Sequence, residues 1–304
     1  MTGKDLEIPI GKRTKLYRFF EMLPGILSYS MILAPFVLSF INPVLAAMFI
    51  IVYIISYFVK SIAMAIRTVQ GYNTLQRAQR MDWSGRLLDL AQPARALEER
   101  SFDDDRLHQL NLRQLAATTG HRVPDDIYNA VIIATYNESR DILEPTIKSV
   151  MDSQYDLSHL ILMIAYEERG GEQVEATAKA LQQEYKHHFK DMIIVKHPGD
   201  LPHEVPGKGA NITYAGYELQ RYIENETINP DNVIVTTLDS DNRPHPIYFA
   251  YLTYEYIMHP DPRHAAFQPL TLFLNNIWDV PAPMRVVATG NSFWNIVNSL
   301  RPHM

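Results

Sequence analysis

The sequence predicts an α/β domain with a largely parallel β-sheet, preceded by a hairpin of two membrane-spanning helices. Two observations support this. Residues 22–59 contain no charged side chain. Beyond residue 128, apolar runs of strand length alternate with longer segments of helical periodicity. Near-continuous apolar strands that alternate with helices are typical of parallel sheets buried on both faces.

The charge-free run is too long for one membrane span, because about 20 helical residues cross the hydrocarbon core. Asn42-Pro43 divides it near the middle, and this pair favours a turn. The run therefore predicts helices over about 23–41 and 44–65, which form a hairpin over 23–66. The alternative is a buried helical hairpin of a soluble protein, although adjacent charge-free runs of this length are rare in soluble domains.

Basic residues flank the hairpin on both sides, and its tip has none. By the positive-inside rule, both flanks are expected in the cytoplasm. The sequence thus predicts a multi-pass protein of the cell membrane, with a cytoplasmic basic N-terminus over 1–22 and a cytoplasmic domain after the hairpin. The flanking basic residues are Lys4, Lys12, Arg13, Lys15 and Arg18 before the hairpin, and Lys60, Arg67, Arg77 and Arg80 at its end.

Residues 67–127 are rich in Arg, Gln, Leu and Asp and predict a solvated juxtamembrane helical linker. Alternatively, Trp83 beside Arg86 would lie at the level of the lipid headgroups. The chain has no cysteine, which excludes disulfides, thiolate nucleophiles and Cys-ligated metals. Its net charge of -6 gives no basic field for nucleic acid, so no nucleic-acid partner is expected.

The α/β domain is predicted over 128–304. Ligands of such domains bind at the carboxyl ends of the parallel strands, so the residues that follow each strand are the candidate site. A further strand end is predicted at Gln268-Pro269. Strands are predicted over 130–136, 160–165, 192–195 and 233–238, and helices from about 141 and over 172–185 and 210–223.

Two predicted strand ends carry groups that suit a nucleoside. The first ends in Thr135, Tyr136, Asn137 and Glu138, which offer a ring, an amide and a carboxylate. Asn-Glu before a helix is also ordinary capping chemistry. The second strand ends in Glu167-Glu168 before a Gly-Gly turn. One of these carboxylates could accept a hydrogen bond from a base, or the turn could be a solvated acidic loop.

The two later strand ends carry groups that suit a diphosphate. Lys208 lies between two glycines at a predicted helix start, where the backbone can approach an anion. The spacing is not that of a Walker A loop. A buried strand then leads directly into Asp239-x-Asp241. Two carboxylates at this spacing can share Mg²⁺ or Mn²⁺, and such an ion would stabilise a departing diphosphate.

Taken in order, these segments resemble the family-2 glycosyltransferases, particularly membrane-bound relatives of cellulose synthase and other polysaccharide synthases. The resemblance covers about residues 128–295. The matching segments are Thr135-Tyr136-Asn137-Glu138, the acidic turn near Glu168, Lys208-Gly209-Ala210-Asn211, Asp239-x-Asp241 and Gln268-Pro269.

The resemblance implies a GT-A fold, a Rossmann-like, mostly parallel sheet. It implies transfer from a nucleotide-sugar, usually UDP-linked, to a glycan or lipid-linked acceptor, with Mg²⁺ or Mn²⁺ and inversion at the anomeric carbon. By position, Thr135, Tyr136 and Glu138 would border the nucleoside, Glu168 would read the base and Lys208 would approach the nucleotide. Asp239 would contact the sugar or ribose and share the metal, and Asp241 would bind the metal.

The chain departs from the family pattern in three respects. Glu167-Glu168-Arg169 replaces an Asp-Asp-Gly type of turn, no catalytic base is found before Met304, and the downstream Gln-x-x-Arg-Trp motif is absent. We expect the chain to be part of a longer protein, with the base beyond Met304, and not to turn over alone; Asp279 is a weak substitute. The alternative functions are a catalytically inactive nucleotide-binding membrane scaffold and a Mg²⁺-dependent nucleotidyltransferase.

Overall fold

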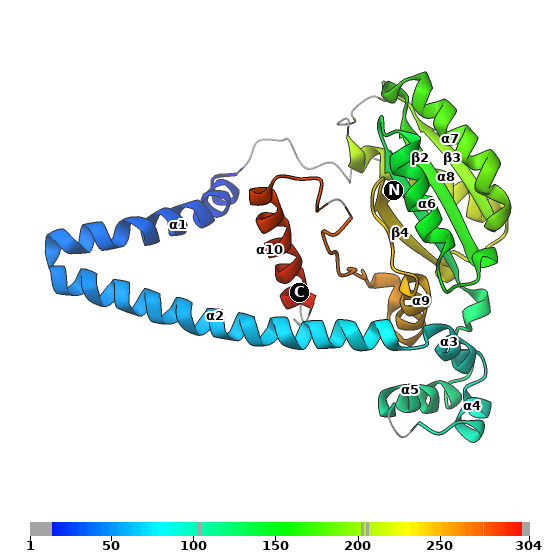
Figure 1. The fold of residues 1–304 in the computed structure, drawn as a ribbon, viewed down its shortest axis with the longest axis horizontal. Coiled ribbons are helices and arrows are strands. Elements are labelled where there is room, and N and C mark those ends of the chain that lie inside the picture. The colour runs from blue at the N-terminus through cyan, green and yellow to red at the C-terminus, as the bar shows by residue number, and fades with distance from the viewer. Residues whose placement is uncertain (1–13, 103–104, 202–203, 205–206, 276, 300–304) are drawn as a thin grey trace. The chain divides into compact units, whose positions relative to one another are not determined.

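A computed structural model describes residues 14–102, 105–201, 204, 207–275 and 277–299 (Figure 1). The predicted roles of Lys4, Lys12 and Arg13 as flanking charges fall outside these residues. The chain divides into two compact units, one of Met1–Tyr72 with Ile296–Met304 and one of Asn73–Asn295.

Two long helices follow one another at the start of the described chain. Helix α1 spans Lys15–Ile41 and α2 spans Pro43–Arg80, and the predicted break at Asn42 is confirmed. Asn42 Oδ1 accepts a hydrogen bond from the Val44 amide at 2.8 Å and so starts α2. None of α1 is buried, and in α2 only Ala46 and Gly71 are. Both helices are long and apolar enough to cross a membrane, and the most apolar stretch of each has no buried residue in the described structure.

The second unit contains a four-stranded parallel sheet in the order β3-β2-β1-β4. The predicted α/β class is thereby confirmed, and each strand ends within two residues of its prediction. All eight residues of β2 are buried, as the apolar pattern of a central parallel strand requires. The strands are β1 Tyr128–Thr135, β2 Leu160–Glu167, β3 Asp191–His197 and β4 Val233–Asp239.

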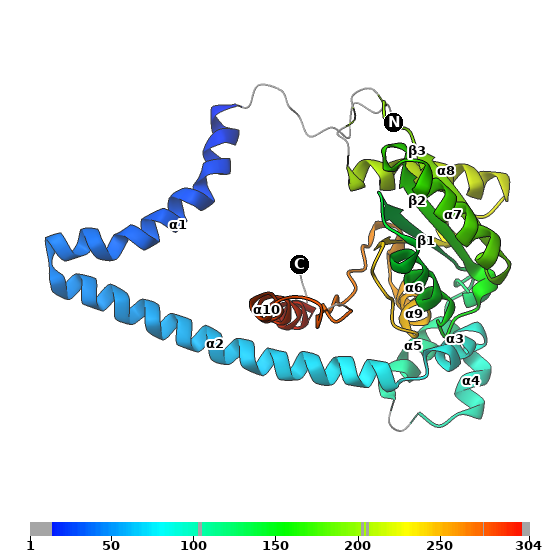
Figure 2. The ribbon, with the colours of Figure 1, turned by 45° about the horizontal axis from the view of Figure 1, so that its top comes forward.

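Helices cover both faces of this sheet (Figures 1 and 2). Helices α6 (Arg140–Met151) and α7 (Glu172–Tyr185) pack on one face, where Val131, Ile133 and Ile164 are buried. Helix α8 (Lys208–Asn225) packs on the other face. Short 3-10 turns lie at Pro124–Asp126, Leu157–His159, Glu168–Gly170, Lys186–His188, Pro230–Asn232 and Pro262–His264.

Residues 67–127 were predicted as a solvated helical linker. Residues 67–80 instead continue α2, and the helices between 83 and 116 form a packed layer. Helices α3 (Trp83–Ala91), α4 (Pro93–Glu99) and α5 (Arg106–Ala116) share a buried core with α9 (Tyr248–Met258). Trp83 is 4% exposed and stacks on Tyr251 with ring centroids 4.1 Å apart, so it does not face lipid. The apolar side of α9 needs a partner, and these short helices supply it.

The predicted strand at Gln268-Pro269 is wrong. Residues 265–275 include no strand, and the segment bonds to α10 (Ala282–Ser299) instead of to the sheet. Asn295 Nδ2 donates to the Thr271 carbonyl at 2.9 Å, and the Phe273 amide donates to Ser292 Oγ at 3.0 Å. Pro269 has no amide hydrogen to offer a neighbouring strand, which favours this arrangement.

Candidate functional site

The sheet has a topological switch point between β1 and β4. From β1 the chain moves outward through β2 to β3, and then α8 returns it to the far side of β1. Ala134 near the end of β1 pairs with Asp239 at the end of β4. The helices that flank a switch point diverge there, and ligands of open α/β sheets bind in the crevice between them.

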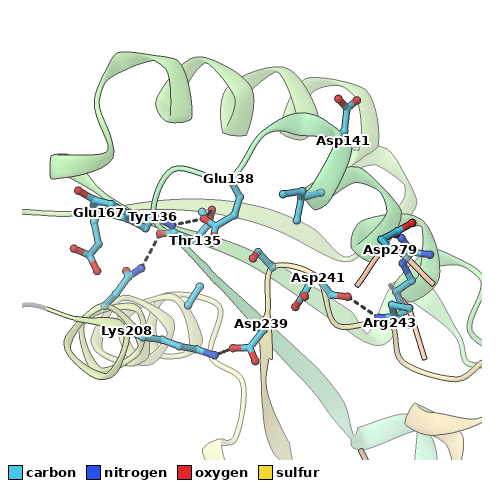
Figure 3. A pocket seen from close by; sticks show the side chains of 15 residues that line it. Thr135, Tyr136, Glu138, Asp141, Glu167, Lys208, Asp239, Asp241, Arg243 and Asp279 are labelled. Atoms are coloured by element: carbon cyan, nitrogen blue, oxygen red, sulfur yellow. Dashed lines mark hydrogen bonds and ion pairs between the residues drawn. The ribbon is translucent and has the colours of Figure 1, made fainter. Parts of the chain in front are cut away.

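A cleft of about 610 Å³ opens at this point (Figure 3). This volume lies within the usual range of small-molecule sites. Six carboxylates and two cationic side chains line it, which leaves an excess of four negative charges. The lining residues are Ala134, Thr135, Tyr136, Glu138, Asp141, Ile142, Glu167, Lys208, Asn211, Asp239, Ser240, Asp241, Arg243, Asn275 and Asp279.

The β1 turn is held together by the Glu138 carboxylate. Glu138 Oε2 accepts hydrogen bonds from Thr135 Oγ1 at 2.6 Å, from the Tyr136 amide at 2.7 Å and from the Asn137 amide at 3.1 Å. Burial alone would raise the pKa of the Glu138 carboxyl, but the hydrogen bonds from Thr135 and Tyr136 outweigh it and lower that pKa. Glu138 therefore shapes the turn, and the half-exposed ring of Tyr136 is left facing the cleft.

Glu138→Gln should destabilise the protein by about 1 kcal/mol at pH 7, because the charged acceptor of three hydrogen bonds becomes neutral. A carboxyl with a lowered folded-state pKa stabilises the fold above its ordinary value of about 4.3, and this stability is lost as the pH falls through the lowered value. The difference from wild type should therefore disappear in acid. Chemical denaturation in detergent from pH 7 to pH 3 measures it, with Glu98→Gln on the exposed side of α4 as the control. A difference independent of pH would show that the charge is not responsible.

The opposite wall of the cleft carries Lys208, Asp239 and Asp241. Lys208, at the start of α8, forms an ion pair with Asp239 at the end of β4 (Figure 3). The Asp241 carboxylate makes no ion pair with another residue of the described chain. Its backbone carbonyl accepts a hydrogen bond from Asn275 Nδ2 at 2.8 Å, which ties the 265–275 segment to the site.

These carboxylates fit a divalent cation that the ligand helps to hold. No group of three or more His, Asp or Glu side chains in the described ranges could enclose a metal by itself. Mg²⁺, however, is usually bound by one or two carboxylates together with water and substrate phosphates. Asp241 is exposed and unpaired among the described residues, and Asp239 is held beside it by Lys208, so the pair suits such a shared site.

Glu167 lines the cleft, and the predicted residue Glu168 does not. Strand β2 runs two residues beyond its predicted end, so Glu167 points to the α8 side, as Ala165 does. Glu167 is 4% exposed and pairs with Arg169. Glu168 turns toward the β3 loop instead. There it accepts from the Gly199 amide at 3.2 Å and pairs with Lys196, and both contacts lower the pKa of the Glu168 carboxyl.

Asn211 forms the floor of the cleft, a role that the spacing of the Lys208 motif did not reveal. It lies one turn into α8 and is 1% exposed. Its Nδ2 donates to the Ala165 carbonyl at 2.8 Å and to the Thr135 carbonyl at 3.3 Å, so one amide ties the ends of β1 and β2 together. The only signal in the sequence was a polar residue three positions after Lys208, on the same face of the helix.

Gly170 allows the β1 and β2 turns to approach each other. A side-chain carbon at Gly170 would overlap the Tyr136 carbonyl oxygen, so any larger residue would push the β1 turn away. Gly171 has φ of +85°, a conformation that suits glycine. Close packing beside the cleft therefore requires glycine at position 170, and the backbone conformation favours glycine at position 171.

Arg243 and Asn275 line the cleft although the sequence did not assign them to the site, and Asp279 lines it with them. Arg243 lies two residues after Asp241, and Asn275 and Asp279 belong to the irregular segment before α10. Asp279, for which the sequence predicts at most a weak role as base, lines this cleft (Figure 3). Gln268 is exposed and is not among the lining residues. The other predicted site residues, Thr135, Tyr136, Glu138, Lys208, Asp239 and Asp241, are brought together.

Comparison with known proteins does not identify the class of this site. No protein-family model matches the chain, and no curated protein is significantly similar to it.

Proposed function

We propose that the protein is a membrane-bound glycosyltransferase that transfers a sugar from a nucleotide-sugar, with UDP-sugars the first candidates, to a glycan or lipid-linked acceptor. One observation carries the proposal. An acidic cleft at the switch point of a parallel sheet places Asp239 and Asp241 beside Lys208. The family-2 resemblance and a GT-A arrangement of the domain are parts of the same proposal.

The charge of the cleft argues for a metal-dependent anionic ligand. A diphosphate would be repelled by an excess of four negative charges unless a cation came with it. Mg²⁺ or Mn²⁺ at Asp239 and Asp241 would supply that charge and stabilise the departing nucleoside diphosphate. Lys208 would then exchange its pairing with Asp239 for the phosphate oxygens, because an ammonium binds phosphate as a mobile point charge.

The remaining lining residues divide the cleft into a nucleoside side and a sugar side. The exposed ring of Tyr136 offers a stacking surface for a base, and Asn211 and Glu167 lie at the strand ends next to it. Arg243 and Asp279 lie beyond Asp241, where the sugar and the acceptor would meet (Figure 3). Asn275 lies there too, because its side chain donates to the Asp241 carbonyl. Inversion would follow from attack of the acceptor hydroxyl on the face of the anomeric carbon opposite the leaving diphosphate.

We further propose that α1 and α2 anchor this domain to a cell membrane, with both flanks in the cytoplasm. Lys15 and Arg18 begin the pair, and Arg67, Arg77 and Arg80 follow the apolar part of α2. In a membrane hairpin these basic residues would lie on the same side of the bilayer, and the positive-inside rule assigns that side to the cytoplasm. Nucleotide-sugars are available there.

Calorimetry on the detergent-solubilised chain tests the proposed ligand. UDP with Mn²⁺ should bind, a UDP-sugar should compete with it, and CTP should not. Competition by CTP together with a sugar phosphate, and not by UDP-sugars, would favour a nucleotidyltransferase and contradict the proposal. No binding of any nucleotide to folded protein would contradict the assignment of this cleft to a nucleotide donor.

A further inference from the structure

The two acidic residues of the proposed metal site belong to a tight turn at the end of β4. The Asn242 amide donates to the Asp239 carbonyl at 3.1 Å and closes this turn. Ser240 and Asp241 occupy its two central positions. The placement of both carboxylates therefore depends on how the peptide groups of the turn are oriented. A single hydrogen bond contributes little to holding such a turn in one conformation.

Two side chains from distant segments fix the next two carbonyl groups of this turn. Thr146 Oγ1, in α6, donates to the Ser240 carbonyl at 2.7 Å. Asn275 Nδ2 donates to the Asp241 carbonyl at 2.8 Å. Three consecutive carbonyl groups, those of residues 239–241, thus each accept a hydrogen bond. The donors come from the turn itself, from α6 and from the irregular segment before α10.

Thr146 is a polar residue on an otherwise apolar side of α6. Leu143, Ile147 and Val150 share that side, and all of them are fully buried, as Thr146 is. A threonine inside a helix commonly bonds to the carbonyl four residues earlier. Thr146 instead donates its hydroxyl hydrogen to Ser240, in another segment. A valine would bury the same shape without the cost of a buried hydroxyl, so the packing of α6 alone does not account for threonine at this position.

The side chain of Ser240 joins the same turn to the β1 turn. Ser240 is buried, and its hydroxyl forms a hydrogen bond with the Glu138 carboxylate. Burial raises the pKa of the Glu138 carboxyl, whereas hydrogen bonds, among them the one from Ser240, lower it. Because Glu138 also accepts from the Tyr136 amide, the turn with the two aspartates is fixed relative to the proposed nucleoside side of the cleft.

We infer that Thr146 and Asn275 are positioning residues that hold the turn of Asp239 and Asp241 in the conformation that binds the metal. Each acts through a backbone carbonyl, and neither has to contact the ion. A turn that is ordered before binding loses less conformational freedom when the ion and the nucleotide arrive, which favours affinity. The inference rests on the proposed function, because the metal-bound nucleotide is the ligand that this turn would serve.

Thr146→Val tests the inference, because it keeps the shape of the side chain and removes the donor to the turn. In the full chain without ligand, hydrogen exchange at residues 239–242 should become faster, since the Asn242 amide reports on closure of the turn. The Mn²⁺-dependent affinity for UDP, measured by calorimetry, should fall about 10-fold, as for other groups that orient metal ligands. Binding measured without Mn²⁺ should not change. Thr146→Ser keeps the hydroxyl and should restore both values to nearly those of wild type.

Thr253→Val is the matched control. Thr253, in α9, is also fully buried, accepts a hydrogen bond from Asn129 Nδ2 at 2.9 Å and is not among the residues that line the cleft. This variant should lose stability as Thr146→Val does, but it should keep the wild-type exchange at residues 239–242 and the wild-type dependence on Mn²⁺. Equal effects of the two valine variants on exchange and on Mn²⁺ dependence would indicate a general loss of stability and would overturn the inference.

Asn275→Ala tests the second donor at an exposed position, and it decides the question if Thr146→Val does not fold. Faster exchange at residues 239–242 together with weaker Mn²⁺-dependent binding would support the inference, and no change in either would overturn it.

The remaining outcomes separate the inference from the proposed function. Faster exchange in Thr146→Val with unchanged Mn²⁺-dependent affinity for UDP would overturn the inference and leave the proposed function in place. If the folded wild-type protein shows no Mn²⁺-dependent UDP binding at all, the proposed function is contradicted, and the inference fails with it.

Discussion

Asp241→Asn is expected to abolish metal-dependent UDP binding, with a loss of at least about 100-fold in affinity in the presence of Mn²⁺. Changes even to outer-shell partners of metal ligands cost about 10- to 100-fold in metal affinity, and Asp241 would contact the ion directly. The substitution preserves shape and removes charge. The cleft should therefore remain folded and lose the carboxylate that we propose binds the metal. Isothermal titration with and without Mn²⁺ measures both affinities.

Asp279→Asn is the matched control, because it removes one carboxylate from the same cleft at the proposed sugar side. Its effect on UDP binding should be small, or slightly favourable, since it reduces the negative charge around a diphosphate. Equal losses in the two variants would show that the cleft responds to overall charge alone. Unchanged Mn²⁺-dependent binding by Asp241→Asn would remove the metal from the proposed site.

Asn211→Asp is expected to destabilise the second unit by about 3 kcal/mol or more at pH 7. The change is isosteric, but it places a carboxylate against the carbonyl oxygens of Thr135 and Ala165, in a position that is 1% exposed. A buried group that loses its partner carries its full desolvation penalty, and the penalty is larger for a charge. Thermal unfolding in detergent measures the loss.

The pH dependence of Asn211→Asp separates this cause from a packing defect. A neutral carboxyl could still donate one hydrogen bond to a carbonyl, so burial should raise the folded-state pKa of the new side chain. The variant should therefore be nearest to wild type below pH 4 and lose stability as the pH rises through that raised value. Asn73→Asp, the same change at an exposed position of α2, should alter stability by less than about 0.5 kcal/mol. A loss that does not change with pH would contradict the buried-charge explanation.

The main elements of the fold could be predicted because their signals are local. An uninterrupted apolar run with Asn42-Pro43 at its middle specifies two long helices, and their exposed apolar side chains agree with that composition. Apolar runs of strand length located β1 to β4 to within two residues, because both faces of these strands are covered. Because parallel strands end at the same edge of a sheet, the sequence predicted that four residues lie close together, namely Thr135, Lys208, Asp239 and Asp241.

Features that depend on packing between distant segments could not be predicted. Residues 67–127 have a polar composition, which predicts little burial. Leu90 and Leu112 are nevertheless buried, because they belong to a core shared with the apolar side of α9. The segment with Gln268 has a strand-like composition, yet its hydrogen-bond partners are on α10. The composition of a segment shows which side chains it can bury. Which other segment it packs against depends on the surfaces that the rest of the folded chain leaves uncovered.

The site shows the same division at the level of single residues. The amino-acid sequence by itself determined the parallel α/β class, the apolar helix pair and the acidic strand end at Asp239 and Asp241, because periodicity and composition act over a few residues. Only the tertiary structure decided that Glu167 lines the cleft in place of Glu168, and that Asn211 joins two strand ends. A strand that continues for two more residues reverses which of two neighbouring carboxylates faces a ligand, and that length is set by pairing with β1 and β3.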